Sequence, residues 1–331
     1  MRTRLSGWVG AAGALCLAST AWAQAGAGDG AATAPTTLTY QVQRGDTLYA
    51  LAAAYLIRPS DYRIIQRLNG VQAPRRLQVG RSLTLPVNLL KTAPEQAVVT
   101  SYRGAVQIDT GQGLATPRQG QAVGEGSLVV TGANAFVRLT LSDNSHMVVP
   151  SNSRVRLSRL RRYLINDALD HGLTVERGRL ESDVTRRRVP GGFRVTTPVS
   201  VSAVRGTEFR IAVDAEGERA ATEVLEGEVA VNSLTDGDAT DIAQANQALA
   251  VTAAGLARAG LLPEPALRDP GAVLSGPRVV VDAVPQPGAR AYRGRLATDA
   301  GLIDAFAETD SADGSTRLDF GPLAMASIIC G

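Results

Sequence analysis

The fold of the first part of the chain is decided by YQVQRGDTL at residues 40–48 and VGRSLTLP at residues 79–86. Apolar and polar residues alternate in both stretches, which is typical of half-buried strands. Between them, apolar residues recur at helical spacing, first at Leu48, Leu51, Ala52 and Tyr55 and then at Ile64, Ile65 and Leu68. The pattern predicts a strand, two short helices and a second strand.

Both predicted helices carry signals at their ends. Asp46 precedes the first helix, where a carboxylate can accept hydrogen bonds from the free N–H groups of the first turn. We expect the second helix to begin at Ser60, ahead of Asp61, and to leave through a left-handed residue in Asn69-Gly70.

This stretch resembles a LysM domain, a small βααβ module that binds polymers containing N-acetylglucosamine. The resemblance rests on the opening at residues 40–48, Leu68-Asn69-Gly70, Pro74 and the closing strand at residues 80–86, which follow in family order. It implies a shallow groove between two loops, where exposed backbone groups meet the amide and methyl of the sugar. The residues that it places there are Gly45, Asp46, Thr47 and Leu48 in the first loop, and Asn69, Gly70, Val71, Pro74 and Leu77 in the second.

The role of Asp46 stays open between helix capping and sugar contact, since a carboxylate is well suited to a cap. We expect Tyr40, Leu51 and Leu68 to lie in the core of this domain. We set the domain at residues 39–88.

Residues 1–23 are typical of a secretory signal peptide. The basic start MRTR precedes a short apolar run at residues 8–17, and AWA at residues 21–23 is typical of a cleavage site. The run is shorter than the roughly 20 residues that cross a bilayer, so we expect no transmembrane segment in the mature chain. Residues 24–38, rich in Ala, Gly and Thr, are expected to form a flexible leader.

Composition argues against several function classes. Removing the signal peptide takes away two arginines and no acidic residue, which lowers the formal net charge from +3 to +1. With 4% aromatic residues, the sequence favours no nucleic-acid partner.

The sequence has two cysteines. Cys16 lies in the signal peptide, where lipidation is the alternative to an ordinary apolar role. Cys330 is the only other cysteine, so we expect no internal disulfide. We also expect no cofactor and no metal.

From residue 98 to about residue 252, short alternating runs are separated by Gly, Asp and Asn, as in GAVQI at residues 104–108 and AFVRLTL at residues 135–141. Many short strands at regular spacing predict an all-β sandwich, roll or barrel. We place this second domain at residues 95–260, so the expected fold class is mainly β and multidomain.

The second domain resembles the FecR family. The resemblance rests on LTVERGRL at residues 173–180, FRVTTP at 193–198, EVLEGEVAV at 223–231 and above all AVRGTEF at 203–209. It implies a periplasmic β-domain with the structural signature Arg205, Gly206, Thr207 and Phe209 and with a protein partner that the sequence does not identify. Family members that relay signals to extracytoplasmic sigma factors need a cytoplasmic segment and an uncleaved span. This chain has a cleavable signal and a LysM-like module instead.

Arginine is concentrated in this domain. Arg205 lies in an apolar strand pattern. It could form a buried ion pair with Glu208, Glu226 or Glu228, and the alternative role is ligand binding. Two further groups form either a solvated, protective strand face or a site for an anionic partner. They are Arg154, Arg156, Arg159, Arg161 and Arg162, and Arg186, Arg187 and Arg188.

Catalysis finds little support. His146 and His171 are the only histidines, and neither has a cysteine nearby or the spacing of a metal site. Ser145 and His146 are adjacent, so on a strand their side chains point to opposite faces. Asp167 and Asp170 near His171 are expected to form a surface turn. The sequence therefore predicts a protein that is not an enzyme.

The last segment, residues 263–331, resembles the early strands of a fibronectin type III-like sandwich, at residues 279–283, 291–297 and 303–307. Such a sandwich needs about seven strands and about 100 residues, so we expect a partial, truncated domain. If the last residues are back-translated with ordinary codons and one G is restored after the codon of Ala324, the new frame encodes DGIYYLR, a turn followed by a strand. A single-base deletion is therefore the alternative to a genuine end.

Together these features predict a non-catalytic, cell-wall-associated protein of the periplasm. Its LysM-like module would tether the FecR-like β-domain to peptidoglycan. The alternatives are a FecR-type signal-relay protein of an envelope regulatory system and an accessory subunit of a peptidoglycan hydrolase.

Overall fold

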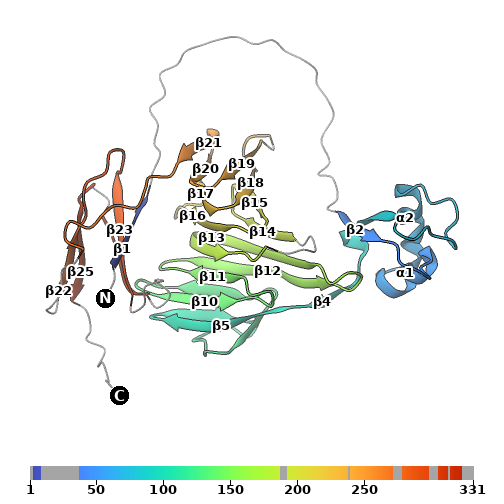
Figure 1. The fold of residues 1–331 in the computed structure, drawn as a ribbon. Helices are drawn as coiled ribbons and strands as arrows, with labels where there is room; N and C mark the ends of the chain where they lie inside the picture. The colour runs from blue at the N-terminus through green and yellow to red at the C-terminus, as the bar shows by residue number, and fades with distance from the viewer. Residues whose placement is uncertain are drawn as a thin grey trace, which may run out of the picture.

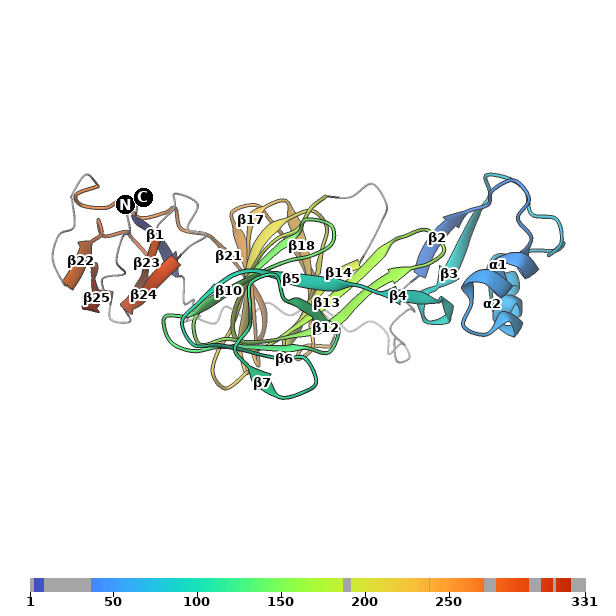
Figure 2. The same cartoon turned by 90° about the horizontal axis from the view of Figure 1, so that it is seen from below.

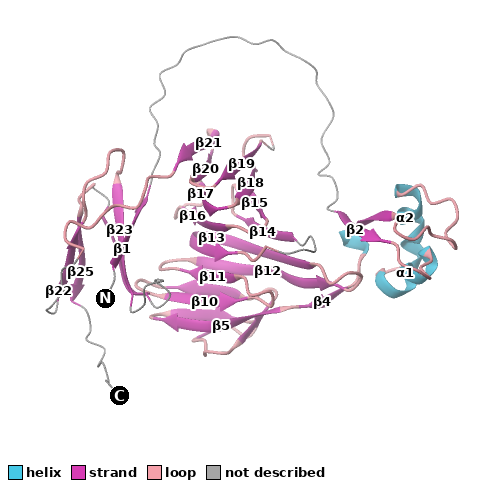
Figure 3. Ribbon diagram, viewed as in Figure 1, coloured by secondary structure: helices cyan, strands magenta, loops and turns pink. Residues whose placement is uncertain are grey.

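The computed structural model describes residues 3–8, 37–186, 192–237, 239–270, 278–297, 305–311 and 314–322. Figure 1 shows three regions: a small module with helices, a β-rich body and a C-terminal region of short strands. Figure 3 shows α-helices in the small module and strands throughout the other two regions. In Figure 2 the small module and the C-terminal region lie at opposite ends of the body. The mainly β, multidomain fold is confirmed.

The small module contains β2 (Thr37–Gln41), α1 (Leu48–Tyr55), the 3-10 turn η1 (Pro59–Asp61), α2 (Tyr62–Leu68) and β3 (Ser82–Pro86). The two strands pair antiparallel, with Tyr40 opposite Leu83. Alternate strand residues and the inner faces of both helices share one buried cluster. The predicted order of strand, helix, helix and strand is therefore confirmed.

The helix limits differ in detail from the prediction. Thr47, not Asp46, caps α1, because its Oγ1 accepts a hydrogen bond from the Ala50 N–H at 3.1 Å. The second helix begins after the turn η1, and no side chain caps it. Gly70, with φ of +58°, supplies the left-handed exit as predicted.

The β-rich body spans residues 92–260. Its strands are β4 Thr92–Pro94, β5 Gln96–Arg103, β6 Val106–Asp109, β7 Leu114–Ala115, β8 Ala122–Gly124, β9 Leu128–Thr131, β10 Phe136–Thr140, β11 His146–Val149, β12 Arg154–Tyr163, β13 Leu169–Asp183, β14 Gly192–Thr196, β15 Ser200–Val204, β16 Glu208–Val213, β17 Ala220–Glu226, β18 Glu228–Ser233, β19 Thr240–Gln244, β20 Gln247–Thr252 and β21 Gly255–Gly260.

These strands form two sheets that share the long strand β13. One sheet has the order β7, β6, β9, β12, β13, β14, β15, β18, β19, with β4 also paired to β12. The other has the order β8, β5, β10, β11, β13, β16, β17, β20, β21. Apolar side chains from alternate positions of both sheets form one buried cluster.

Gly178 marks the point at which β13 passes from one sheet to the other. Its φ is +79°, and a Cβ built there would lie 2.6 Å from the carbonyl oxygen of Asn152. Only glycine combines this backbone angle with so close an approach. The long strand can therefore hold both sheets together around one core.

The small module and the β-rich body are joined by ordered structure. The 3-10 turn η2 (Val87–Leu89) leads from β3 to β4, the first strand of the body. The ammonium of Lys91 donates to the carbonyls of Ala53 and Ala54 at the end of α1, each at 3.0 Å. Tyr163 at the end of β12, with Ile165 and Ala168 from the turn that follows, is buried in the core of the small module. The segment between the two regions thus couples them.

The C-terminal region contains β22 (Arg278–Asp282), β23 (Ala291–Ala297), β24 (Ala305–Ser311) and β25 (Arg317–Pro322). The strands pair as β22 with β25 and β23 with β24, and they share a small buried cluster. The sequence did not predict β25. Residues 323–331, on which the deletion hypothesis rests, lie outside the described residues.

A further strand, β1 (Thr3–Trp8), pairs with β23. This strand lies within residues 1–23, which the sequence predicts to be a signal peptide. Residues 9–36, which hold the rest of that peptide and most of the leader, lie outside the described residues.

Charged side chains hold the C-terminal region against β13. An Arg295 guanidinium nitrogen lies 2.6 Å from a carboxylate oxygen of Glu181, and Arg179 pairs with Glu308. Burial acts to raise the pKa of Glu181, but the charge and hydrogen bond of Arg295 lower it below its usual value. Burial raises the pKa of Glu308. Pairs with so little solvent around them favour one orientation of the two regions.

Candidate functional site

The first loop of the expected groove is held by Asp46. Its carboxylate accepts hydrogen bonds from the Tyr40 hydroxyl at 2.8 Å and from the Gln43 N–H at 2.7 Å. Burial and the bond to Asp46 raise the pKa of Tyr40 to about 12, so the hydroxyl stays a donor at neutral pH. The expected capping role is wrong in detail: Asp46 closes the turn before the helix, and Thr47 caps the helix itself.

Two glycines leave the backbone of both loops open. Gly45 has φ of +94° and Gly70 has φ of +58°, and a Cβ built on either would meet no atom within 4 Å. A ligand can therefore approach the main chain closely at both positions, without a side chain in between.

Asn69 is a structural bridge in the second loop. Its amide NH2 donates to the carbonyls of Ile65 at 2.9 Å and of Thr84 at 2.8 Å, and its Oδ1 accepts from the Thr84 N–H at 2.7 Å. These bonds tie the end of α2 to β3. The side chain of Asn69 is thus committed to the fold, and its contribution to a site is the shape of the loop.

The two loops meet through a single main-chain bond. The N–H of Leu48 donates to the carbonyl of Pro74 at 2.8 Å. The side chains of Leu48 and Val71 are buried in the core, whereas Pro74 and Leu77 are half-buried. Of the nine residues placed in the groove, only Leu48 and Val71 are buried. Gly45 and Gly70 are exposed, and Asp46, Thr47, Asn69, Pro74 and Leu77 are half-buried.

Two tyrosines that the sequence did not point to lie beside this groove, Tyr49 exposed and Tyr62 half-buried. Tyr49 of α1 and Tyr62 of α2 have ring centroids 4.7 Å apart, with planes inclined by 51°. Tyr49 is 41% exposed, although it lies in an otherwise apolar helix. A signal was present, because Tyr49 falls outside the helical spacing of Leu48, Leu51, Ala52 and Tyr55.

The signature of the second domain has a structural role. Gly206 has φ of +64° and Gly227 has φ of +83°, and a Cβ on Gly227 would lie 3.0 Å from the carbonyl oxygen of Gly206. The Thr207 hydroxyl donates to the carbonyl of Glu228 at 3.0 Å, and Phe209 is fully buried. The signature therefore packs two tight turns against each other.

Arg205 does not form the buried pair that was considered for it. Its side chain is exposed, and no carboxylate of the described residues pairs with it. The hydrophobic pattern around it misled the prediction, because β15 ends at Val204 and Arg205 already belongs to the turn that Gly206 makes.

The arginines of β12 are neutralised by carboxylates, mostly from neighbouring segments. Their partners are Glu176 for Arg154 and Arg156, Asp170 for Arg159, Glu125 for Arg161, and both Glu95 and Asp167 for Arg162. The hydrogen bond from Arg161 lowers the pKa of Glu125. This favours the structural reading of the cluster. Of the other arginine group, Arg187 and Arg188 lie outside the described residues.

The two histidines and Asp170, the candidates for a catalytic group, have structural surroundings. Asp170 and His171 are buried in β13, not in the expected surface turn, and the Tyr163 hydroxyl donates to Asp170 at 3.1 Å. His146 lies 3.1 Å from the Thr140 hydroxyl. Among the described residues, no three His, Cys, Asp or Glu side chains are grouped as a metal would require.

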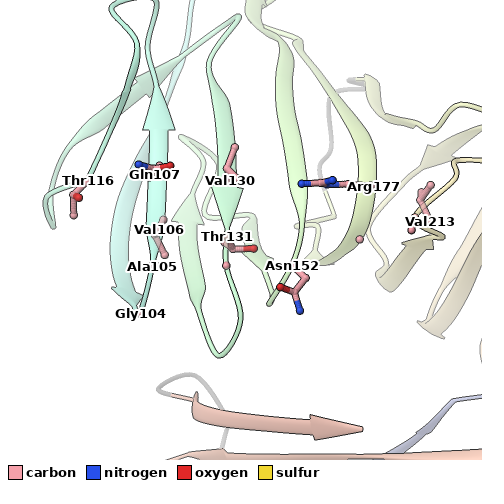
Figure 4. A pocket seen from close by; sticks show the side chains of 13 residues that line it. Gly104, Ala105, Val106, Gln107, Thr116, Val130, Thr131, Asn152, Arg177 and Val213 are labelled. Carbon is pink, nitrogen blue, oxygen red and sulfur yellow. The ribbon is translucent and has the colours of Figure 1, made fainter. Parts of the chain in front are cut away.

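A cavity of about 780 Å³ opens at one end of the β-rich body. Figure 4 shows its walls, which come from the turns and strand ends around β6, β9, β13 and β16. The polar side chains Gln107, Thr116, Asn152 and Arg177 lie on these walls among small apolar residues. The cavity is large enough for a small ligand or a partner side chain.

Comparison with family models identifies two domains in this chain. Residues 40–86 match the LysM domain, and residues 127–230 match FecR protein. The chain therefore carries a LysM domain followed by a FecR domain. Both are families of binding or regulatory domains.

Two crystal structures of a candidate anti-sigma factor from Parabacteroides distasonis resemble the chain at 18% identity, with TM-scores of 0.35 and 0.34. Each match covers 40% of this chain and 59% of the solved chain, so this chain spans less than two thirds of that protein. No curated protein matches the chain. In the part of the chain that the structure describes, no helix is long and apolar enough to cross a membrane.

Proposed function

We propose that this chain is a non-catalytic cell-wall-binding protein of the periplasm. Its LysM domain holds peptidoglycan and keeps the FecR domain at the wall, where the FecR domain meets a protein partner. The observation that carries the proposal is the LysM match at residues 40–86, together with two loops whose backbone is open at Gly45 and Gly70.

The geometry suits an amino-sugar polymer. An N-acetyl group offers one donor, one acceptor and a methyl, which match free backbone groups beside the half-buried surfaces of Pro74 and Leu77. A site this shallow buries little area, so we expect a dissociation constant in the micromolar to millimolar range, about −4 to −8 kcal/mol.

The coupling of the two regions adds to this function. Tyr163, Ile165 and Ala168 share the core of the LysM domain, and Lys91 bonds to the end of α1. Attachment to the wall therefore raises the effective concentration of the β-rich body near its partner and also restricts its orientation.

The test is co-sedimentation of the purified mature protein with intact sacculi. We expect it to pellet with the wall, and to remain in the supernatant in the Gly70→Asn variant. Asparagine tolerates the left-handed backbone of Gly70, and its side chain would fill the open space where the ligand approaches. A folded parent protein that stays in the supernatant overturns the proposal.

A matched control is Gly237→Asn in the β-rich body. Gly237 has φ of +50°, and a Cβ there would also meet no atom within 4 Å. This variant has the same chemical change on a similar backbone, away from the LysM domain, so it should pellet as the parent does. A turbidity assay on purified peptidoglycan tests the absence of catalysis, since lysis by the chain alone contradicts it.

The FecR match at residues 127–230 favours a second candidate, a relay in an envelope signalling system. A relay needs a segment on the cytoplasmic side of the membrane, whereas a wall tether does not. Protease treatment of spheroplasts separates the two: complete digestion of the chain from outside supports the tether, and a protected fragment supports the relay.

A further inference from the structure

Positive charge is concentrated in the LysM domain. Residues 37–90 contain seven arginines, two aspartates and no lysine or glutamate, which gives a formal net charge of +5. The whole chain carries only +3. The remainder of the protein is therefore slightly acidic, and the charge of the domain is a property of this segment.

These arginines have almost no internal carboxylate partners. Residues 37–90 are all described, and their one ion pair joins Arg58 to Asp61 at 3.1 Å. The other acidic residue, Asp46, is bound to Tyr40 and Gln43. All seven arginine side chains are exposed. The charge is consequently available to a partner.

Two of the arginines lie near the pair formed by the exposed Tyr49 and the half-buried Tyr62. The guanidinium carbon of Arg63 lies 5.8 Å from the centre of the Tyr62 ring, and its Nε donates to the Tyr62 hydroxyl at 3.4 Å. The pKa of Tyr49 is raised chiefly by its hydrogen bond to Tyr62, against the opposing effect of the nearby charges of Arg75 and Arg63. Two rings and two cations thus form one surface, which we call the tyrosine–arginine patch (Tyr49, Tyr62, Arg63, Arg75).

This patch is continuous with the expected groove. Tyr49 directly follows Leu48 and Arg75 directly follows Pro74, and these two neighbours are joined by the 2.8 Å bond between the Leu48 N–H and the Pro74 carbonyl. A polymer lying across the two loops would therefore extend over the patch.

We propose that the tyrosine–arginine patch binds the carboxylate-bearing peptide stems of peptidoglycan, next to the sugar held in the groove. This rests on the proposed function. The sugar amide and hydroxyl groups are neutral and give exposed arginines no counter-charge. The stems carry carboxylates, which the planar guanidinium group matches in geometry, and small apolar side chains, which can lie on the tyrosine rings.

The experiment compares three ligands for the mature protein by calorimetry at low and high salt. They are an uncharged N-acetylglucosamine oligomer, a glycan strand stripped of its stems with the freed lactyl carboxylates capped as amides, and a stem-bearing muropeptide of matched sugar length. We expect all three to bind, with the stem-bearing ligand about 2- to 10-fold tighter at low salt, the range given by two exposed charge pairs. The difference should shrink at high salt, because exposed charges are screened.

The variant Arg63→Gln/Arg75→Gln should lose this preference and keep the affinity for the stripped strand. The control Arg118→Gln/Arg219→Gln removes two exposed charges from the β-rich body and should keep the preference. Equal binding of stripped and stem-bearing ligands by the parent, or an unchanged preference in the first variant, overturns the proposal. An equal loss in the control also overturns it, because net charge alone would then explain the effect.

Failure of the proposed function gives a different result, namely no binding of any of the three ligands by folded protein. A further arm uses polyglutamate at matched carboxylate concentration. If it competes as well as the stem-bearing muropeptide, the patch is a general anion surface and the assignment to stems is wrong.

Discussion

The arginines of β12 and those of the LysM domain carry the same charge in different surroundings. On β12, each of the five arginines contacts a carboxylate. In the LysM domain, one of seven does. An arginine-rich stretch therefore indicates an anion site only where the fold brings no carboxylates to it, and the more conspicuous cluster in this sequence is the neutralised one.

If the LysM arginines do not hold their domain together, uncharged hydrogen bonds must do so. Asn69 makes three hydrogen bonds between α2 and β3, so Asn69→Ala should leave polar backbone groups without partners. We expect a loss of about 2–4 kcal/mol in the free energy of unfolding of this domain, measured by urea denaturation. The exposed Asn88→Ala is the control and should change stability by less than about 0.5 kcal/mol. A similar small change for Asn69→Ala would contradict the bridge.

The next effect tests the β12 side of the comparison. Glu176 serves both Arg154 and Arg156, so Glu176→Gln leaves two arginines facing each other without a counter-charge. We expect a loss of about 1 kcal/mol in the stability of the β-rich body, because both pairs are partly exposed. The exposed Glu216→Gln should have no measurable effect. If the two variants are equally stable, the ion pairs of β12 contribute nothing measurable to stability, as we expect of the LysM arginines.

Much of the fold could be predicted from the sequence, because apolar spacing reports directly on burial. Helical spacing predicted α1 and α2, and alternation predicted most strands of the body. The expectation that Leu68 lies in the core was wrong: in α2 only Ile65 is buried, and Ile64 and Leu68 are exposed, because the short helix turns a single residue of its stripe inward. The pairing of charges was different, since Arg161 finds Glu125 and Arg162 finds Glu95 across strands that are distant in sequence. A local sequence pattern does not contain information on contacts between residues so far apart in the chain.

The candidate site shows the same limit. The loops could be located from the resemblance to a LysM domain, and the left-handed exit at Asn69-Gly70 could be predicted from the end of the second helical pattern. The roles of Asp46 and Asn69 could not, because each is decided by a partner on another element, Tyr40 in one case and Thr84 in the other. Tyr49 and Tyr62 form a pair only once the two helices pack.

Two carboxylates of the body, Glu223 and Glu125, should respond to pH in opposite ways. Burial raises the pKa of Glu223 in spite of the nearby charge of Arg210, so its contribution to stability is full below the unfolded pKa of about 4.3 and falls as the pH rises through the folded value. Glu223→Gln should therefore be more stable than the parent at pH 7 and equal to it near pH 4, in thermal melts across that range.

Glu125→Gln should respond in the opposite sense. The hydrogen bond from Arg161 lowers the pKa of Glu125, so this carboxylate stabilises the fold above its unfolded pKa and loses that effect as the pH falls through the folded value. The variant should be less stable than the parent at pH 7, and the difference should vanish in acid. If both variants are more stable than the parent at pH 7, or both are less stable, then pairing with arginine does not decide how these two carboxylates contribute to stability.

The smallest effect is expected where the LysM arginines are removed singly. Arg44→Gln, Arg67→Gln and Arg76→Gln should each change the free energy of unfolding by less than about 0.5 kcal/mol, because these side chains are exposed and contact no carboxylate within residues 37–90. Added salt should even stabilise this domain slightly, since it screens the mutual repulsion of a net charge of +5. If these substitutions instead cost as much as Glu176→Gln, the LysM arginines are structural, and their charge is not free for a ligand.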